Sequence, residues 1–277
     1  MVAVSRVEQA YLTACLAELA ALKPGNVHAY AAGHRMTVAD FEASARLSAP
    51  AIAAPGLTVG ERILTALHRT REAVFSNTNL GILLLCAPLA QAALQSTGHD
   101  LRQELHAVLE ALTVGDAASA YEAIRLANPG GLGDSPHHDV RQPPLVTLLE
   151  AMRIASDRDR IAAQYIADFA DVLGLGLDRL TAGQQRWREL EWAISSTYLG
   201  FLGAFPDSHI QRKFGLETAE AVMVEARKFD ALLSGTRDPR VVLADLLAFD
   251  SALKEKDINP GTSADLTVTT LFVSNLQ

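Results

Sequence analysis

The chain has 277 residues, of which 49% are hydrophobic and 20% are charged, and its formal net charge is −8. Disordered proteins combine low hydrophobicity with high charge density, so this composition excludes that class. General nucleic-acid-binding proteins usually carry an excess of basic residues, whereas here acidic residues are in excess. The length suits one large domain or two small ones, with enough material for a buried core.

The number of cysteines and the length of the apolar runs exclude further classes of protein. Cys15 and Cys86 are the only cysteines, which excludes a disulfide scaffold and a cysteine-based zinc module. The first residues lack the basic-then-apolar pattern of a signal sequence. The most apolar run, at 80–94, contains Pro88 and is shorter than the roughly 20 residues that span a bilayer. We therefore expect a cytoplasmic protein that binds no membrane.

Helical signals recur along the chain, and no stretch alternates apolar and polar residues as strands do. The segments 5–8, 37–40 and 58–61 have the capping-box pattern, so each is expected to begin a helix. Apolar residues continue the first helix to Leu22, and Pro24 is expected to end it. Further helices are predicted at 80–96, 100–112, 116–127, 145–154, 156–172, 182–202, 218–233, 239–253 and 264–276.

The sequence thus predicts an all-α fold, with about twelve helices in a single domain over residues 1–277. Short polar links join most of the predicted helices, which favours one antiparallel array. The longest non-helical stretch runs from 128 to 144 and is rich in Gly and Pro. Long loops in compact helical domains are usually functional. Five short polar patches at helix junctions hold the candidate functional residues.

The first patch is Lys-Pro-Gly-Asn-Val-His at 23–28. Pro and Gly end helices, and a lysine in the last turn suits the helix dipole, so a simple helix stop explains it. Alternatively, the lysine is held at a rigid turn and aimed at an anion. On that interpretation Lys23, Asn26 and His28 are candidate ATP-binding residues.

The second patch is Asn77, Thr78 and Asn79, directly before the apolar helix. One such residue is enough to cap a helix. The surplus carboxamides and hydroxyl are candidate ligands of a ribose, a phosphate or a hydrated metal, with a plain capped turn as the alternative.

The third patch is Asn-Pro-Gly-Gly-Leu-Gly-Asp at 128–134, followed shortly by His-His-Asp. Glycine-rich loops let backbone N–H groups approach phosphates, so Gly130 and Gly131 are candidate phosphate contacts. No Lys-Ser/Thr pair follows and no strand precedes it, which excludes a Walker A loop and a dinucleotide fingerprint. Asp134 and Asp139 are candidate Mg²⁺ ligands. The two histidines lack a third ligand at useful spacing and are interpreted as exposed loop residues.

The fourth patch combines an aspartate, a histidine and two adjacent cations. A helix that begins near Ser208 would place Asp207 at its cap and would place His209 and Arg212 on one face. With Lys213, these groups form a phosphate-binding and acid–base arrangement at a helix start. A solvated charged turn is the alternative.

The fifth patch precedes the last predicted helix. Thr262 and Asp265 resemble a capping box with Asp in place of Glu. Unpaired N–H groups at that helix start would bind an anion, which makes Asn259, Thr262 and Ser263 candidate ligands. Asp265 is either a cap or a metal ligand.

Without reference to any family, the pattern is that of an all-α enzyme whose helix ends converge on a polyphosphate. Two or three aspartates would hold Mg²⁺, and Lys and Arg would neutralise phosphate oxygens. Asp159 and Tyr165 are lesser candidates, because the helix dipole alone explains Asp159.

Four motifs occur in order along the chain: Lys-Pro-Gly at 23–25, Asn-Thr followed by Gly at 77–81, Asp-Ser-x-Ile-x-Arg-Lys-x-Gly at 207–215, and Asn-Pro-Gly-Thr-Ser-Ala-Asp-Leu at 259–266. Together they resemble the triphosphoribosyl-dephospho-CoA synthase family over nearly the whole length. The resemblance implies an all-α enzyme that takes ATP and 3′-dephospho-CoA. The 2′-hydroxyl of the dephospho-CoA ribose attacks the anomeric carbon of the ATP ribose, and adenine leaves.

The resemblance also suggests roles for the residues of the patches. We expect carboxylates for Mg²⁺ or for hydroxyl activation at Asp139, Asp207 and Asp265, phosphate ligands at Lys23, Arg212 and Lys213, ribose or phosphate ligands at Asn77, Thr78 and Asn79, and an acid for adenine departure at His209. The alanine-rich helix faces leave a homodimer contact open, although no stripe stands out from the core pattern.

The chain departs from the family pattern at three positions. The better-known members read Lys-Pro-Gly-Leu-Val-Asp, whereas this chain has Asn26 and His28, and they carry a lysine where this chain has Leu80. It resembles a divergent branch found in archaea and methylotrophic bacteria. Ribosyl transfer to another acceptor, in the synthesis of a methanopterin-type cofactor, is therefore the second hypothesis. A helical protein that binds a nucleotide without turnover is the third.

Overall fold

The computed structural model describes residues 2–34, 36–96, 100–131 and 138–277, and these residues form fourteen α-helices, one π-helical segment and one 3-10 helix. The elements are α1 (Val4–Ala20), α2 (Val38–Ile52), α3 (Val59–Arg71), α4 (Leu80–Gln95), α5 (Leu101–Glu110), α6 (Val114–Ala127), α7 (Leu148–Ala155), α8 (Arg160–Ile166), η1 (Asp171–Gly176), α9 (Leu177–Arg186), α10 (Leu190–Ala204), α11 (Ser208–Phe214), α12 (Leu216–Gly235), η2 (Pro239–Val242), α13 (Leu243–Glu255) and α14 (Gly261–Leu276). The predicted all-α class is confirmed. None of the helices described is long and apolar enough to cross a membrane.

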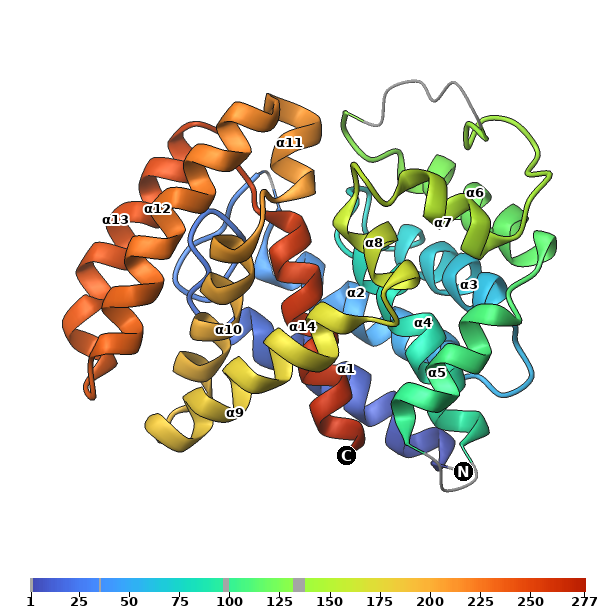
Figure 1. Cartoon of the computed structure of the whole chain (residues 1–277), viewed down its shortest axis with the longest axis horizontal. Coiled ribbons are helices and arrows are strands. Elements are labelled where there is room, and N and C mark those ends of the chain that lie inside the picture. Colours follow the sequence, from blue (N-terminus) through green and yellow to red (C-terminus); the bar gives the residue numbers. More distant parts are fainter. Residues whose placement is uncertain (1, 35, 97–99, 132–137) are drawn as a thin grey trace.

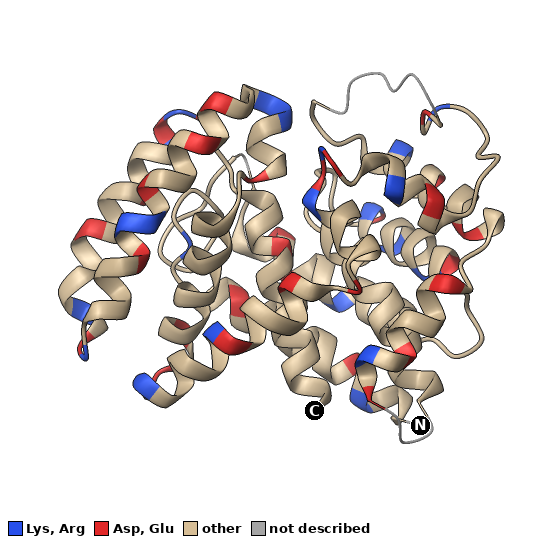
Figure 2. Cartoon of the chain, viewed as in Figure 1, with Lys and Arg blue, Asp and Glu red and all other residues tan. Residues whose placement is uncertain are grey.

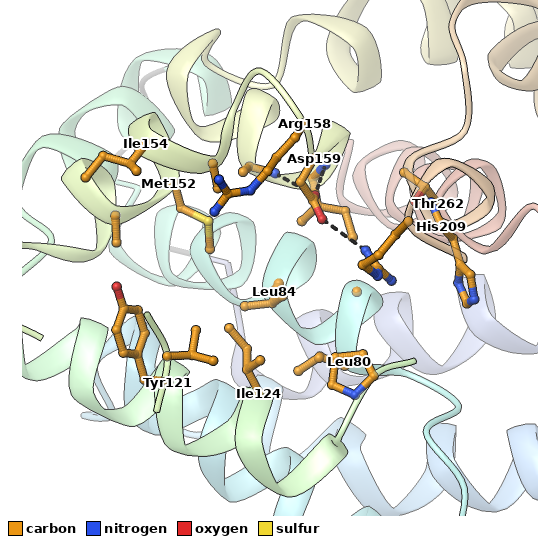
Figure 3. A pocket seen from close by; sticks show the side chains of 18 of the residues that line it. Leu80, Leu84, Tyr121, Ile124, Met152, Ile154, Arg158, Asp159, His209 and Thr262 are labelled. Atoms are coloured by element: carbon orange, nitrogen blue, oxygen red, sulfur yellow. Dashed lines mark hydrogen bonds and ion pairs between the residues drawn. The ribbon is translucent and has the colours of Figure 1, made fainter. Parts of the chain in front are cut away.

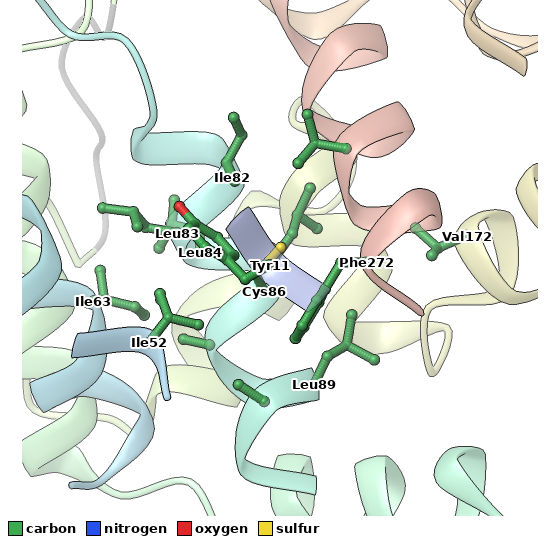
Figure 4. Packing of buried hydrophobic residues seen from close by; sticks show 14 of the residues in the cluster. Tyr11, Ile52, Ile63, Ile82, Leu83, Leu84, Cys86, Leu89, Val172 and Phe272 are labelled. Carbon is green, nitrogen blue, oxygen red and sulfur yellow. The ribbon is translucent and has the colours of Figure 1, made fainter. Parts of the chain in front are cut away.

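Helix α14 runs through the middle of the molecule and packs against α1, α4 and α10 (Figure 1). Helices α2–α8 gather on one side of it and α9–α13 on the other (Figure 1). One apolar cluster surrounds Tyr11, Cys86 and Phe272 (Figure 4), and a second surrounds Tyr198 and Leu246. Because α14 contributes to both clusters, it connects the two sides of the fold. The single-domain organisation stays a prediction.

The central helix is buried although its sequence is rich in threonine. The hydroxyls of Thr267, Thr269 and Thr270 each donate to the carbonyl four residues earlier, at 2.7, 2.7 and 2.9 Å. Buried polar groups need hydrogen-bond partners, and these local bonds supply them without a second helix. Figure 2 shows charged residues mainly on outer helices such as α12 and α13, with few on α14.

The capping pattern correctly locates two of the three helix starts it predicts. Thr37 and Thr58 form capping boxes at the starts of α2 and α3. The capping box expected at Ser5 is wrong, because α1 begins at Val4 and no side chain caps it. The N-cap is Ala3, two residues earlier than predicted, so Ser5 lies inside the first turn and its hydroxyl is not at the N-cap position.

Two predicted helices are each divided in the structure. The segment 156–172 is interrupted at Asp168 and Phe169, which have positive φ angles of 48° and 56°. The segment 182–202 breaks between α9 and α10, where Trp187 has an extended backbone. Phe169 and Trp187 are 0% and 6% exposed. Phe169 belongs to the apolar cluster around Tyr11 and Phe272, and Trp187 belongs to the one around Tyr198. Tertiary packing therefore overrides the local helix propensity at both breaks.

Helices α3 and α6 pack closely at Gly60. A Cβ at Gly60 would lie 2.5 Å from the Cα of Asp116, and the Gly60 N–H donates to the Asp116 carboxylate at 2.8 Å. We expect Gly60→Ala to lower the free energy of unfolding by about 1–3 kcal/mol, because the two helices must separate. Urea unfolding measures the difference. The control is Gly235→Ala, which meets no atom within 4 Å; equal effects of the two substitutions would contradict the close crossing.

Candidate active site

A cavity of about 380 Å³ lies among the starts of α4, α8, α11 and α14 and the sides of α6 and α7. Its volume is in the range of small-molecule binding sites. The wall has two chemically different parts (Figure 3). The polar part includes Asn77, Asp159, His209, Arg212, Thr262 and Asp265, and the apolar part includes Leu84, Tyr121, Ile124, Leu148, Met152 and Ile154.

Asp207 joins the starts of α11 and α14 beneath this cavity. Its Oδ1 accepts from the N–H groups of His209 and Ile210 at 2.9 and 3.2 Å. Its Oδ2 accepts from the N–H and the hydroxyl of Ser263, both at 2.8 Å. Burial raises the pKa of Asp207, and the four hydrogen bonds oppose that rise. The expected cap is confirmed, but the residue is 0% exposed and does not line the cavity.

The start of α14 differs from the predicted capping box. The helix begins at Gly261 and no side chain of its own segment caps it. Thr262 therefore lies in the first turn, where its hydroxyl accepts from the His209 N–H at 3.2 Å and lies 3.0 Å from the Ser208 hydroxyl. The capping interpretation of Thr262 is wrong for this reason. The N–H of Ser263 is also not open to an anion, because Asp207 occupies it.

The carboxyl group of Asp265 lies on the cavity wall against the start of α4. A Cβ at Gly81 would lie 2.0 Å from its Oδ2, so this approach requires glycine. In the part of the chain that the structure describes, no donor is hydrogen-bonded to this carboxyl group. Burial, followed by the charges of Asp207, Glu18 and Asp159, raises the pKa of Asp265 well above its usual value. Its oxygens thus accept no hydrogen bond among the described residues, but a cation that binds there must displace the proton that the raised pKa favours.

The imidazole of His209 packs against the same turn. A Cβ at Gly261 would lie 2.5 Å from its Nδ1, and its Nε2 is buried without a partner among the described residues. Burial, together with the charges of Arg212 and Lys213, lowers the pKa of His209 to about 3. The ring is therefore neutral at pH 7. It carries no extra proton for a leaving base unless a bound anion raises that pKa.

Arg212 connects α11 to the glycine-rich loop. Its Nε donates to the carbonyl of Gly130 at 3.0 Å, and its guanidinium lies 3.3 Å from the carboxylate of Asp159. Gly131 has a φ of 74° and would place a Cβ 2.7 Å from the Arg212 carbonyl, so the loop needs glycine there. Lys213 is exposed and extends beside Gly130. The third and fourth patches are thus in contact.

The second patch contributes one wall residue. Asn77 lines the cavity, and its side-chain oxygen accepts from the first N–H of α4 at 3.2 Å. Thr78 is hydrogen-bonded to Ser44 at 2.6 Å, and Asn79 donates to Thr70 at 3.1 Å. Thr78 and Asn79 are buried between helices and do not line the cavity.

The first patch lies inside the protein, away from the cavity wall. Lys23 is 0% exposed, forms an ion pair with Glu18 at 2.8 Å, and donates to Asn26 and to the carbonyl of Val27 at 3.2 and 2.6 Å. Asn26 in turn donates to Asn259 at 2.8 Å. The patch therefore supports the turn that precedes α14.

Asp250 of α13 completes this internal network. It accepts from the Gly25 N–H at 2.8 Å and lies 3.2 Å from Nε2 of His28 and 3.0 Å from Nζ of Lys254. Hydrogen bonds from His28, Lys254 and Gly25 outweigh burial and lower the pKa of Asp250, whereas burial lowers the pKa of His28. Sequence reasoning missed Asp250 and Lys254, because both lie within a regular helix without a motif.

Asp139, one of the two carboxylates expected from the long loop, is less open than predicted. Asp139 lines the cavity but forms a two-pronged ion pair with Arg141, at 2.8 and 2.7 Å. Asp134 lies outside the described residues. Among the residues that are described, no group of three or more His, Cys, Asp or Glu side chains could hold a metal ion.

The wall also contains residues that the sequence did not single out. Tyr121 of α6 and Met152 of α7 follow the ordinary apolar periodicity of their helices and were indistinguishable from core. Arg158 precedes α8 and extends along the wall toward Met152 (Figure 3). The lesser candidate Asp159 lies in the wall, while Tyr165 is buried and donates to the Leu84 carbonyl at 2.6 Å.

Residues 4–277 match the model of the CitG family, ATP:dephospho-CoA triphosphoribosyl transferase. A crystal structure from Archaeoglobus fulgidus, described as a candidate triphosphoribosyl-dephospho-CoA synthase, superposes with a TM-score of 0.65. It is 24% identical and covers 84% of this chain and 96% of its own, which shows a shared fold. No curated protein matches the sequence.

The buried ion pair of Lys23 predicts a stability role that is separate from ATP binding. Lys23→Met leaves the Glu18 carboxylate buried without its partner and should lower the free energy of unfolding by about 3–5 kcal/mol. The double variant Glu18→Leu/Lys23→Met should recover most of that loss and bind ATP as the wild type does. Urea unfolding and ATP titration measure these effects. If the stable double variant lost ATP binding, Lys23 would instead be an ATP-binding residue.

The lowered pKa of His209 predicts a specific acid sensitivity. The unfolded state protonates this histidine near its ordinary pKa of 6.5 and the folded state only near 3. Its contribution to stability is therefore complete above pH 6.5 and is lost as the pH falls toward 3. We expect His209→Gln to lose less stability than the wild type between pH 7 and pH 5, measured by urea unfolding. The exposed His68→Gln variant is the control, and parallel curves for all three proteins would contradict the burial of His209.

Proposed function

The chain belongs to the ATP:dephospho-CoA triphosphoribosyl transferase family, and from this premise we propose that its cavity transfers the triphosphoribosyl group of ATP to 3′-dephospho-CoA. This assignment rests on the way that separate polar patches meet at one cavity. Four of the five patches each contribute at least one residue to its wall, among them Asn77, Gly131, Arg212 and Asp265. The remaining patch, at 23–28, supports the turn before α14 and thereby the position of Asp265.

The reaction balances without a further reactant. The 2′-oxygen of the acceptor forms a bond to C1′ of the ATP ribose as the bond from C1′ to N9 of adenine breaks. The acceptor loses its hydroxyl proton and adenine leaves as the neutral base with a proton gained. Positive charge develops on the ribose in the transition state, so fixed groups must hold the triphosphate and orient the ring.

The polar part of the wall suits the triphosphate. Arg212 is fixed by Asp159 and Gly130, which leaves guanidinium N–H groups for phosphate oxygens. Thr262 and His209 line the same wall, although Nε2 of His209 is itself buried and has no partner among the described residues. An incoming anion would raise the pKa of His209, and a protonated imidazole would then donate to phosphate or to the leaving base. Asp207 positions His209 and Thr262 from beneath and touches no substrate.

Mg²⁺ fits the carboxylates of this wall. Asp265 has no bonded donor in the described part of the chain. Asp159 lies on the same wall, but its carboxylate caps α8 and pairs with Arg212. Mg²⁺ is usually bound by one or two carboxylates, with substrate phosphates and water completing its shell. When bound, it would supply positive charge to the triphosphate. Asp139 is already engaged by Arg141, and a role for Asp134 stays a prediction.

A second acceptor class is favoured by one observation. Leu80 lies on the cavity wall, where the better-known family members carry a lysine. An apolar side chain at this position removes one cation from the polar end, which suits an acceptor with fewer phosphates, such as a pterin-type cofactor precursor. Both cysteines are buried free thiols, which supports a reducing, cytoplasmic setting for either reaction.

Adenine release tests the proposed function. The purified protein with ATP, Mg²⁺ and 3′-dephospho-CoA should release adenine, detected by chromatography, and should release none when the acceptor is omitted. Arg212→Gln should raise the KM for ATP by about ten-fold or more, because a charge-assisted phosphate contact is lost. The control is Arg240→Gln, which breaks a surface ion pair with Glu189.

The outcomes of this assay separate the three hypotheses. ATP binding without adenine release would point to another acceptor if a pterin-type acceptor restores release, and to a nucleotide-binding protein without turnover if it does not. Neither binding nor release would contradict the assignment of ATP to this cavity. An Arg212→Gln enzyme with wild-type kinetics would remove the polar part of the cavity from the active site.

A further inference from the structure

Phosphate binding does not account for the apolar part of the cavity. Tyr121 and Ile124 of α6 lie opposite Met152 and Ile154 of α7, with Leu84 of α4 between them (Figure 3). Arg158 extends along this part of the wall toward Met152 (Figure 3). A guanidinium is planar and stacks well on a flat aromatic ring. A neutral, flat aromatic group would gain contacts with the thioether, the phenol ring and the aliphatic side chains.

The donor nucleotide has the same two-part chemistry as the cavity. ATP carries its triphosphate on one side of the ribose and an uncharged aromatic base on the other. If Arg212 and Thr262 hold the phosphates, the ribose lies in the middle of the cavity and the base extends toward Leu84 and Met152. This orientation rests on the proposed function, because it takes ATP as the donor.

A hydrogen bond made by Tyr121 determines which polar group the apolar part of the cavity can bind. The phenol of Tyr121 donates its single proton to the carbonyl of His138 at 2.9 Å. Tyr121 is 4% exposed, and burial, followed by the charge of Asp139, raises its pKa, so the phenol stays protonated at neutral pH. Its oxygen can then only accept a further hydrogen bond. The 6-amino group of adenine is a donor, whereas the 6-oxo group of hypoxanthine or guanine is an acceptor.

We propose that the apolar part of the cavity is a purine-base subsite, in which the Tyr121 hydroxyl accepts a hydrogen bond from the 6-amino group of the donor's adenine. A 6-oxo base would place two acceptors against each other and leave both unsatisfied. The subsite therefore selects ATP over inosine and guanosine triphosphates, and Tyr121 is its specificity-determining residue.

Kinetics with ATP and ITP test this assignment. The wild type should prefer ATP by about ten-fold or more in kcat/KM, since a site built to accept from an N–H rejects an analogue that lacks it. Tyr121→Phe should lose most of this preference, because kcat/KM for ATP falls while that for ITP does not. A variant that keeps the wild-type ratio would overturn the proposal.

A matched control separates base recognition from loop support. Tyr121→Phe also removes the bond to the His138 carbonyl and so loosens the loop. Arg125, one turn further along α6, donates to the Val140 carbonyl of the same loop but does not line the cavity. Arg125→Gln should lower the activity with ATP and ITP alike and leave their ratio unchanged. Loss of the ratio in Arg125→Gln would assign the preference to the loop instead.

Binding of the free bases separates this inference from the proposed function. Calorimetry with adenine and hypoxanthine needs no turnover. Adenine should bind the wild type more tightly, and Tyr121→Phe should abolish the difference. If this holds while no transfer to dephospho-CoA occurs, the subsite stands and the acceptor is wrong. If no base binds, or if adenine competes with dephospho-CoA and not with ATP, the donor-base subsite is overturned.

Discussion

The carboxylate of Asp207 is the contact on which the active-site geometry depends. Helix starts leave backbone N–H groups without partners, and a buried carboxylate is unfavourable without donors. Asp207 satisfies both requirements at once, because its two carboxylate oxygens accept hydrogen bonds from three N–H groups and one hydroxyl of α11 and α14. The relative placement of the two helices is thereby fixed. His209 and Arg212 on one, and Thr262 and Asp265 on the other, consequently face a single cavity.

A second layer of polar contacts holds the turn before α14 in place. The Lys23–Glu18 pair and the bond between Asn26 and Asn259 connect the end of α1 to this turn. Buried ion pairs add little net stability compared with apolar packing, although breaking one is strongly unfavourable. Their effect here is therefore geometric. The Lys-Pro-Gly motif at 23–25 therefore supports the candidate site indirectly, because its contacts hold the backbone at the start of α14.

The sequence predicted the parts of the structure that depend on local chemistry. Periodicity gave the helical class, and Thr37 and Thr58 located two helix starts, because capping involves residues three apart. The breaks at Phe169 and Trp187 place these rings in the two apolar clusters, whose members come from many helices, and no local pattern records that membership. In the candidate site, likewise, local sequence was enough to recognise the polar residues at helix junctions.

Other site residues could not be recognised from local sequence. Tyr121 and Met152 carry the pattern of core residues and line the cavity only because α6 and α7 meet there. The burial of Lys23 depends on Glu18 and on the packing of α1 against α14, so its sequence position alone could not show that it points away from the cavity. The charge of the wall is likewise a property of the assembled fold. Its carboxylates at Asp139 and Asp159 balance the guanidinium groups of Arg158 and Arg212, while the raised pKa of Asp265 and the lowered pKa of His209 favour their neutral forms. A bare polyphosphate would therefore meet no net positive charge there, and the proposed function consequently requires that a bound cation or the rearranged side chains neutralise the triphosphate.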